Sequence, residues 1–120
     1  MLKKLFTIAT ISFFSVIPFK AHAASGCTSA SYYGVDDGFH GAITANGERF
    51  NAYGYSTAHR SLPFGTRLRV TNQSNGKSVI VRVNDRGPFV AGRSLDLSYG
   101  AFASIASPSQ GVARVCYSRV

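Results

Sequence analysis

The sequence predicts an all-β fold, a small closed barrel. Most of its regular patterns are short runs of β-forming residues bounded by turns, a single stretch has helical spacing, and the 120 residues include twelve glycines. Short strands joined by glycine-rich turns are typical of small barrels rather than of α/β sheets. There is no internal repeat, low-complexity tract or linker, so we expect one domain.

The first 23 residues have the pattern of a secretory signal peptide. Lys3 and Lys4 form a basic start, residues 5–19 are mainly apolar, and residues 21–23 (Ala-His-Ala) fit a small-x-small cleavage site. The alternative is a retained membrane anchor, but the apolar stretch is short for a span of about 20 residues. We therefore expect an exported protein, periplasmic or secreted, whose domain comprises residues 24–120 and is not stably inserted in a membrane.

The domain after this segment is basic. Its ten Lys and Arg residues exceed its five acids, which gives a net charge of about +5, and nine of the ten cations are arginine. An exported basic domain meets anionic lipid or an acidic wall polymer. Its compartment argues against nucleic acid as a partner.

Two cysteines lie near the ends of the domain, Cys27 and Cys116. An even count in an oxidising compartment favours a disulfide, which by the loop-entropy model is worth roughly 4 kcal/mol for so long a loop. The alternative is lipidation of Cys27, since residues 24–27 loosely resemble a lipobox. Ala24 stands where a large aliphatic residue is usual, Lys20 interrupts the apolar run, and Cys116 would stay unpaired. The disulfide is therefore preferred.

Strand and turn patterns follow along the chain. Residues 30–34 are rich in β-forming side chains and end at glycine, which predicts a short strand. Small and polar residues come next, so we interpret Asp36 and Asp37 as solvated turn residues. The Asn46-Gly47 pair predicts a tight turn just before Glu48.

The clearest element is a hairpin over residues 66–83 with its turn at Asn75-Gly76. Alternation places its apolar side chains on one buried face: Leu68, Val70, Val79, Val81 and Val83. By the same alternation we expect Asp85 to point to the side of these valines, at the end of the strand. A carboxylate in such a place is costly unless it is hydrogen-bonded, paired or functional.

The last third contains the one helical pattern and a final strand. Asp96 or Ser98 can cap a short helix that runs through Ala106. Residues 107–111 end it, and residues 112–120 predict a strand. Its inward side chains are Ala113, Val115 and Tyr117.

Five blocks of the sequence, in this order and spacing, resemble the rare lipoprotein A family of septal-ring lytic transglycosylases: residues 30–34, 44–50, 57–66, 83–89 and 96–98. The resemblance covers essentially the whole domain. It implies a six-stranded double-psi β-barrel with one or two short helices, similar to plant expansins and family 45 glycosidases. It also implies a lyase that cleaves peptidoglycan glycan strands between N-acetylmuramic acid and N-acetylglucosamine, preferring strands without stem peptides. The muramyl C6 hydroxyl attacks its own anomeric carbon and leaves a 1,6-anhydro end.

The positions matched for this chemistry are Asp85, Glu48 and His59. Asp85 is the first choice as an acid that then acts as base, Glu48 would stabilise oxocarbenium charge or share the proton transfers, and His59 would orient a carboxylate or a sugar hydroxyl. Each has a structural alternative. Asp85 could accept backbone N–H bonds in its own turn, Glu48 could pair with Arg49 or Arg60 on the surface, and His59 could make a structural hydrogen bond.

The candidates for substrate binding are Tyr33, Arg60, Arg86 and Phe89. Arginines that line or flank a groove would attract the lactyl carboxylates of bare glycan strands: Arg60, Arg67, Arg69, Arg86 and Arg93. The aromatic side chains of these candidates have a structural alternative, because aromatic residues are often part of the hydrophobic core. No Cys/His cluster has metal-ligand spacing, so we expect no metal. We also expect no cofactor. The protein is predicted to be a monomer whose partner is the glycan strand. The rival interpretation is a non-catalytic wall-binding or loosening module similar to expansins, which would not need both Glu48 and Asp85.

Overall fold

The computed structural model describes residues 25–120 of the 120-residue chain. The predicted signal peptide, residues 1–23, lies outside the described residues. Within the described part, no helix is long and apolar enough to cross a membrane.

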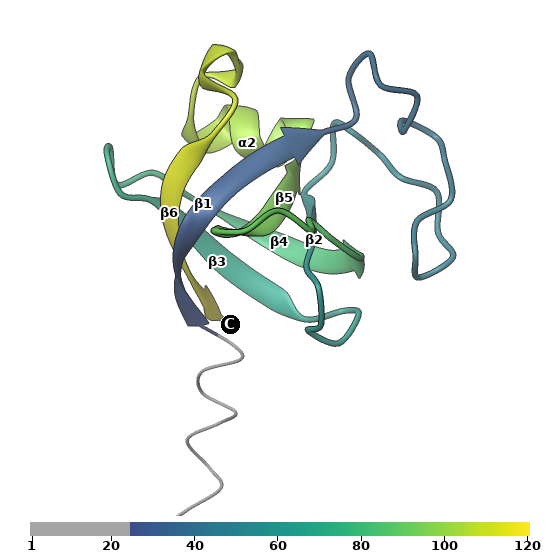
Figure 1. Cartoon of the computed structure of the whole chain (residues 1–120), viewed down its shortest axis with the longest axis horizontal. Helices are drawn as coiled ribbons and strands as arrows, with labels where there is room; N and C mark the ends of the chain where they lie inside the picture. The colour runs from purple at the N-terminus through teal and green to yellow at the C-terminus, as the bar shows by residue number, and fades with distance from the viewer. Residues whose placement is uncertain (1–24) are drawn as a thin grey trace, which may run out of the picture.

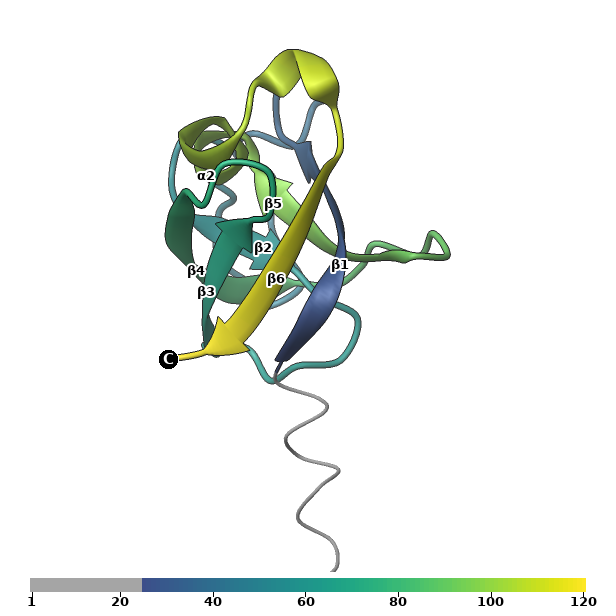
Figure 2. The same cartoon turned by 90° about the vertical axis from the view of Figure 1, so that its left-hand side faces the viewer.

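Six strands close into a barrel, which confirms the predicted fold class (Figure 1). They are β1 (Ser25–Tyr33), β2 (Ser56–Ala58), β3 (Arg67–Asn72), β4 (Ser78–Asp85), β5 (Arg93–Ser98) and β6 (Ala113–Arg119). The order around the barrel is β1-β5-β2-β4-β3-β6. The pairs β1–β5 and β2–β4 are parallel, and the remaining neighbours are antiparallel. Figure 2 shows β1 and β6 crossing the face of the barrel side by side.

The predicted hairpin is confirmed as β3 and β4, which are paired from Arg67 opposite Arg82 to Thr71 opposite Ser78. Its apolar face builds the core together with residues from the other strands and the helix. The core cluster comprises Ala30, Leu62, Leu68, Val70, Val81, Val83, Leu95, Leu97, Ala101, Phe102, Ile105, Ala113 and Val115. Because these side chains fill the interior of so small a barrel, polar chemistry is left to its outer face and loops.

Helix α2 (Tyr99–Ile105) covers one end of the barrel, and the short 3-10 helix η3 (Pro108–Gln110) follows it. Of the two predicted caps Ser98 is the one used, since its hydroxyl accepts from the backbone N–H of Ala101 at 3.4 Å. Asp96 instead belongs to β5, a strand that the sequence patterns did not locate.

Strand β1 begins at Ser25, five residues before the sequence pattern predicts. Those extra residues are small and polar, and they are strand because they pair with β6. Cys27 lies directly opposite Cys116 in this pairing, and the two form the predicted disulfide. A sulfur atom held in a disulfide cannot carry a lipid.

The longest connection, residues 34–55 between β1 and β2, projects from one side of the barrel (Figure 1). Its tight turn at Asn46-Gly47 closes a small hairpin, with a bridge between Ile43 and Arg49. Asp36 is exposed, and Asp37 accepts from the N–H groups of Gly34 and Phe39. Both are turn residues, as the sequence predicts.

Candidate active site

Asp85 lies at the end of β4, where three donors converge on its carboxyl group. The hydroxyl of Tyr33 donates to Oδ2 at 2.8 Å, and the backbone N–H groups of Ala45 and Arg86 donate to Oδ1 at 3.0 Å each. The Arg86 bond is the local turn contact foreseen as the structural alternative. The bonds from Tyr33 and Ala45 come from distant parts of the chain, so they fix the carboxyl group relative to β1 and the long loop.

A bulge in β4 turns Asp85 to the outer face of the barrel wall. Thr57 of β2 is registered with Val83 and Ala58 with Asp85, so Asn84 is an extra residue in β4. Bulges re-aim side chains in this way. Thr57 and Val83 are fully buried, and the next row, Ala58 with Asp85, lies on the opposite face of the sheet from the core, although Ala58 is also covered. The prediction that Asp85 shares the buried face of the preceding valines is therefore wrong, because simple alternation does not include the bulge.

Tyr33 is the side chain that links this carboxyl group to β1. Its ring is stacked on Phe50 with centroids 4.4 Å apart, and the edge of Phe39 approaches it at 5.7 Å. Burial, and then the hydrogen bond to Asp85, raises the pKa of Tyr33, so its hydroxyl stays protonated and donates. One ring face is covered by Phe50, which leaves Tyr33 better placed to hold Asp85 than to stack on a sugar.

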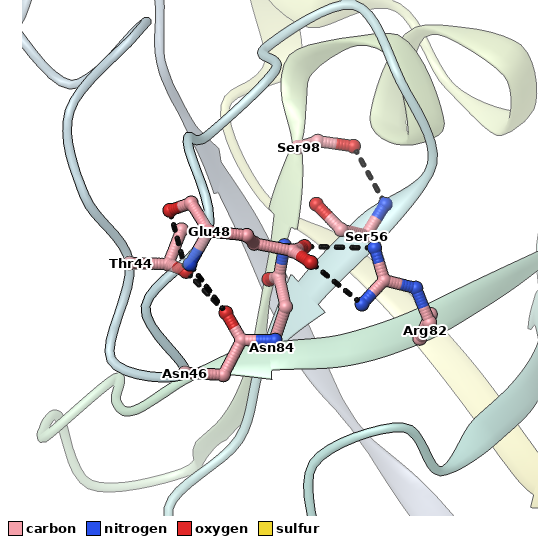
Figure 3. Close-up of polar contacts among 7 residues, drawn as sticks. All are labelled: Thr44, Asn46, Glu48, Ser56, Arg82, Asn84 and Ser98. Atoms are coloured by element: carbon pink, nitrogen blue, oxygen red, sulfur yellow. Dashed lines mark hydrogen bonds and ion pairs between the residues drawn. The ribbon is translucent and has the colours of Figure 1, made fainter.

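Glu48 is held on the outer face by two side chains of β4 (Figure 3). Arg82 binds both of its carboxylate oxygens, at 2.7 and 3.2 Å, and the Asn84 amide donates to Oε2 at 2.7 Å. These bonds, that from Arg82 first, lower the pKa of Glu48 to about 2. The prediction that Glu48 forms its ion pair with Arg49 or Arg60 is wrong. Arg82 takes the place because its outward position on β4 faces the tip of the loop.

The loop that carries Glu48 is well ordered by its own bonds. Thr44 donates its hydroxyl to the Asn46 side chain and to the Glu48 carbonyl, and the Asn46 side chain accepts from the Glu48 N–H. The N–H of Asn46 also donates to the carbonyl of Asn84 at 3.2 Å. Glu48 and Asp85 are thus joined through one short loop, which touches both.

His59 is buried just after β2, where it braces a turn. Its Nδ1 accepts from the N–H groups of Ser61 and Leu62, both at 3.0 Å, so a neutral ring carries its proton on Nε2. Burial, followed by the charges of Arg60 and Arg86, lowers its pKa. The structural hydrogen bond foreseen for His59 is present. The backbone N–H of His59 donates to the Asp85 carbonyl at 3.2 Å, which places the turn next to that residue.

The other predicted binding residues differ in whether their side chains are exposed or already bonded within the protein. Arg86 donates to the carbonyls of His59 and Leu62 and lies 3.8 Å above the ring of Phe64, so its guanidinium holds the same turn together. Arg60 and Phe89 are exposed, Phe89 by 78%. These two, unlike Arg86, are available to a ligand.

A third carboxyl group, Asp96, lies in the outward row with Asp85. Ala58 is registered with Asp96 on β5 and with Asp85 on β4, so two strand spacings, roughly 10 Å, separate their backbones. The hydroxyl of Ser31 on β1 donates to Asp96 at 2.9 Å. Burial raises the pKa of Asp96 above its usual range, opposed by Ser31 and Arg93 and assisted by the nearby Asp85 charge. The sequence patterns suggested Asp96 as a helix cap, and the family resemblance included it in the block 96–98 without giving it a role. Its position between two leucines of a strand was the available signal.

Residues 25–117 match the lytic transglycolase family of double-psi β-barrel domains. The chain belongs to this family. Its relatives include the probable endolytic peptidoglycan transglycosylase RlpA of a Nostoc species, 60% identical over 86 residues that are 72% of this chain and 23% of the relative. The endolytic peptidoglycan transglycosylase RlpA of Pseudomonas aeruginosa is 53% identical over 87 residues, 72% of this chain and 25% of that protein. The chain thus spans about a quarter of the length of these relatives, and the resemblance predicted from the sequence is confirmed.

Solved structures with the same fold include proteins of other groups. An expansin from Clavibacter michiganensis superimposes with a TM-score of 0.64 at 26% identity, covering 80% of this chain and 50% of the expansin. A point mutant of that expansin was solved in complex with cellohexaose. The Streptomyces papain inhibitor has a TM-score of 0.62 at 24% identity, covering 80% of this chain and 94% of the inhibitor, a likeness of fold alone.

In this lytic transglycolase domain the candidate carboxyl groups lie on β4, on β5 and on the long loop that contacts β4. Three carboxyl groups differ in environment: Glu48 is kept ionised by Arg82, Asp96 has a raised pKa, and Asp85 is surrounded by three donors. Carboxyl groups with contrasting environments are the usual arrangement for dividing acid and base roles. Within residues 25–120 no group of three or more His, Cys, Asp or Glu side chains is arranged to hold a metal ion.

Proposed function

We propose that this domain is an endolytic peptidoglycan lytic transglycosylase. It would cleave the bond between N-acetylmuramic acid and N-acetylglucosamine in glycan strands, preferring strands without stem peptides, and leave a 1,6-anhydro-muramyl end. The family membership and the names of its relatives support the reaction class. The observation that carries the proposal for this chain is the pair of carboxyl groups, Asp85 and Asp96, in one outward row of the barrel wall.

The reaction needs one proton delivered and one removed. The muramyl C6 hydroxyl forms a bond to C1 of the same sugar while the bond from C1 to the leaving O4 breaks; O4 takes up a proton, and the C6 hydroxyl loses one, so no water is consumed. A carboxyl group with a raised pKa suits the first transfer, and an acceptor suits the second. We assign proton donation to Asp96 and proton acceptance to Asp85, in place of the sequence-based expectation that Asp85 performs both transfers or shares them with Glu48.

Glu48 and His59 have supporting roles in this proposal. Because Glu48 stays ionised, it cannot deliver a proton at neutral pH, and its fixed negative charge would stabilise developing oxocarbenium charge. His59 braces the turn beside Asp85 and so positions it. Exposed Arg60 and Phe89 would contact the glycan, while Tyr33 and Arg86 would act by holding Asp85 and the turn.

An expansin-like, non-catalytic action on the wall is the second candidate, favoured by the shared fold. The deciding experiment incubates the domain with purified peptide-free glycan strands and analyses the products by mass spectrometry. If the domain is a transglycosylase, the new muramyl ends should be lighter by one water than the products of hydrolysis. Binding to the strands with no new ends would overturn the proposal in favour of the expansin-like function.

A further inference from the structure

A pocket of about 320 Å³ opens on the outer face beside Glu48. It is lined by Glu48, Arg49, Asn51, Gly54, Tyr55, Ser56, Arg82 and Asn84, and we call it the Arg49 pocket. Its volume is at the lower end of the range of ~300–1,000 Å³ that is usual for small-molecule sites. The pocket therefore has room for one compact unit of a polymer.

The walls of the Arg49 pocket are preformed. On one side, the loop hairpin is closed by backbone bonds between Ala42 and Phe50 at 2.7 Å and between Thr44 and Glu48 at 2.8 Å. On the other, the Ser98 hydroxyl accepts from the N–H of Ser56 at 3.2 Å (Figure 3). The same hydroxyl donates to the carbonyl of Gly54 at 2.7 Å. A site that is already ordered loses little entropy when it binds.

The charges in the pocket favour an anion. Glu48 and Arg82 form an ion pair and cancel each other, and the pKa of Glu48, about 2, keeps that pair intact at neutral pH. Arg49 is the remaining charged group of the lining, and no carboxylate of residues 25–120 forms a salt bridge with it. One of its nitrogens, Nη1, donates to the Gly41 carbonyl at 2.9 Å, which orients the guanidinium and leaves its other N–H groups for a ligand.

The rest of the lining suits a saccharide. Tyr55 is 58% exposed and offers a ring at the pocket wall, while Asn51 and Ser56 contribute polar side chains. The fixed Glu48 carboxylate can accept from sugar hydroxyls or from an acetamido N–H. A few polar groups beside an aromatic ring are the usual lining of a small-molecule site.

We propose that the Arg49 pocket binds a carboxylate-bearing sugar of the glycan strand, with Arg49 as the contact to the carboxylate. This inference rests on the proposed function and names the subsite that selects its substrate. The pocket adjoins the candidate active site, because Asn84 lines the pocket and the next residue is Asp85, and because the loop before Glu48 donates to Asp85 through Ala45. A stem peptide converts the lactyl carboxylate into a neutral amide, which removes the charge-assisted hydrogen bond to Arg49.

The test measures binding without turnover, using Asp85→Asn protein and calorimetric titration. The probes are peptide-free glycan oligomers and the same oligomers with their carboxylates converted to methylamides. Adding Arg49→Gln should weaken binding of the carboxylate oligomer by about tenfold or more and leave binding of the methylamide nearly unchanged. Arg114→Gln is the matched control, since it removes an exposed arginine from β6, away from the pocket, and should change neither.

An equal loss with both oligomers, or an equal loss from Arg114→Gln, would overturn the assignment, since the effect would then be general charge attraction. Melting temperatures of the variants verify that each is folded, and Arg49→Lys should recover part of the preference for the carboxylate. The result of this binding test can be distinguished from the result of the test for anhydro ends. If binding depends on Arg49 but the wild type releases no anhydro ends, the pocket assignment is supported and the catalytic proposal is overturned. If the wild type releases anhydro ends but binding does not depend on Arg49, the catalytic proposal is supported and the pocket assignment is overturned.

Discussion

The roles of single side chains in this domain depend on which face of the wall they occupy. Asp85 makes its contacts outward, to Tyr33 and Ala45, and replacing it with asparagine keeps its shape and much of its hydrogen bonding. We expect Asp85→Asn to lower the rate of anhydro-end formation by about 10²–10⁴-fold, the usual contribution of general acid–base catalysis. Steady-state assays on peptide-free strands measure this.

Binding and melting temperature should change little in Asp85→Asn. Asp37→Asn is a suitable control, because Asp37 is an exposed turn carboxylate bonded to two backbone N–H groups of the same loop. If Asp85 were only structural, the variant would lose stability, binding and turnover together.

Glu48 gives a prediction about pH. Its pKa is lowered in the folded state from 4.5 to about 2, so ionised Glu48 stabilises the fold above pH 4.5, and that contribution is lost as the pH falls toward 2. Glu48→Gln should be less stable than the wild type at pH 7 by under about 1 kcal/mol, because the ion pair is exposed. The difference should shrink between pH 4.5 and 2, as measured by urea unfolding at each pH. A difference that stays constant over this interval would show that the ion pair contributes nothing.

Local pattern predicted part of the site and missed the rest for identifiable reasons. The position of Asp85 after a run of alternating valines singled it out, and three hydrogen-bond donors do meet at its carboxyl group, while its catalytic role stays a prediction. Its direction was wrong because the extra residue Asn84 is visible only in the pairing of β4 with β2. Arg82 and Asp96 were missed because the groups next to them come from parts of the chain distant in sequence: Arg82 meets the long loop, and Asp96 lies between β1 and β2.

At the scale of elements, β1 and the long loop are joined by a tight packing contact at Gly34. A methyl group there would lie 2.5 Å from the ring of Phe50 and 2.7 Å from Ala52, and the backbone φ of +113° already disfavours other residues. Gly34→Ala should therefore displace Phe50 from the ring of Tyr33 and cost about 1–3 kcal/mol, as overpacking does. The variant should have a lower melting temperature and a lower turnover, because Tyr33 holds Asp85 in place.

Gly38→Ala is the control for this change. Gly38 also has a positive φ, +82°, but a methyl group there meets nothing within 4 Å. It should show only the smaller cost of backbone strain and keep its turnover. Equal effects at the two glycines would mean that strain, and not the packing of Phe50, is responsible.

The elements themselves were predicted unevenly. The β3–β4 hairpin, helix α2 and strand β6 follow from periodicity and turn residues within a single stretch of chain. Strand β2 is only three residues long, and β5 is paired on both sides with strands distant in sequence, so both owe their conformation to the closed sheet. These two strands carry the row that joins Asp96 to Asp85, and for that reason the site was harder to predict than the fold.

At the scale of the whole molecule, the disulfide and the candidate site lie at opposite ends of β1. Cys27 is near its start, bonded to Cys116 on β6 across 89 residues of sequence, while Ser31 and Tyr33 near its other end hold the two aspartates. The crosslink closes almost the entire described chain into one loop. Its effect should therefore fall on the stability of the barrel and spare the chemistry.

We expect the double variant Cys27→Ser/Cys116→Ser to lose roughly 4 kcal/mol of unfolding free energy, mainly because its unfolded chain is less restricted. Urea unfolding of the variant and of the oxidised wild type measures the loss, and wild type treated with a reducing agent should match the variant. Below its unfolding midpoint the variant should release anhydro ends at nearly the wild-type rate, because Asp85, Asp96 and their hydroxyl donors lie away from the crosslink. A folded variant that has lost turnover would show that the disulfide sets the register of β1, and with it the position of Ser31 and Tyr33.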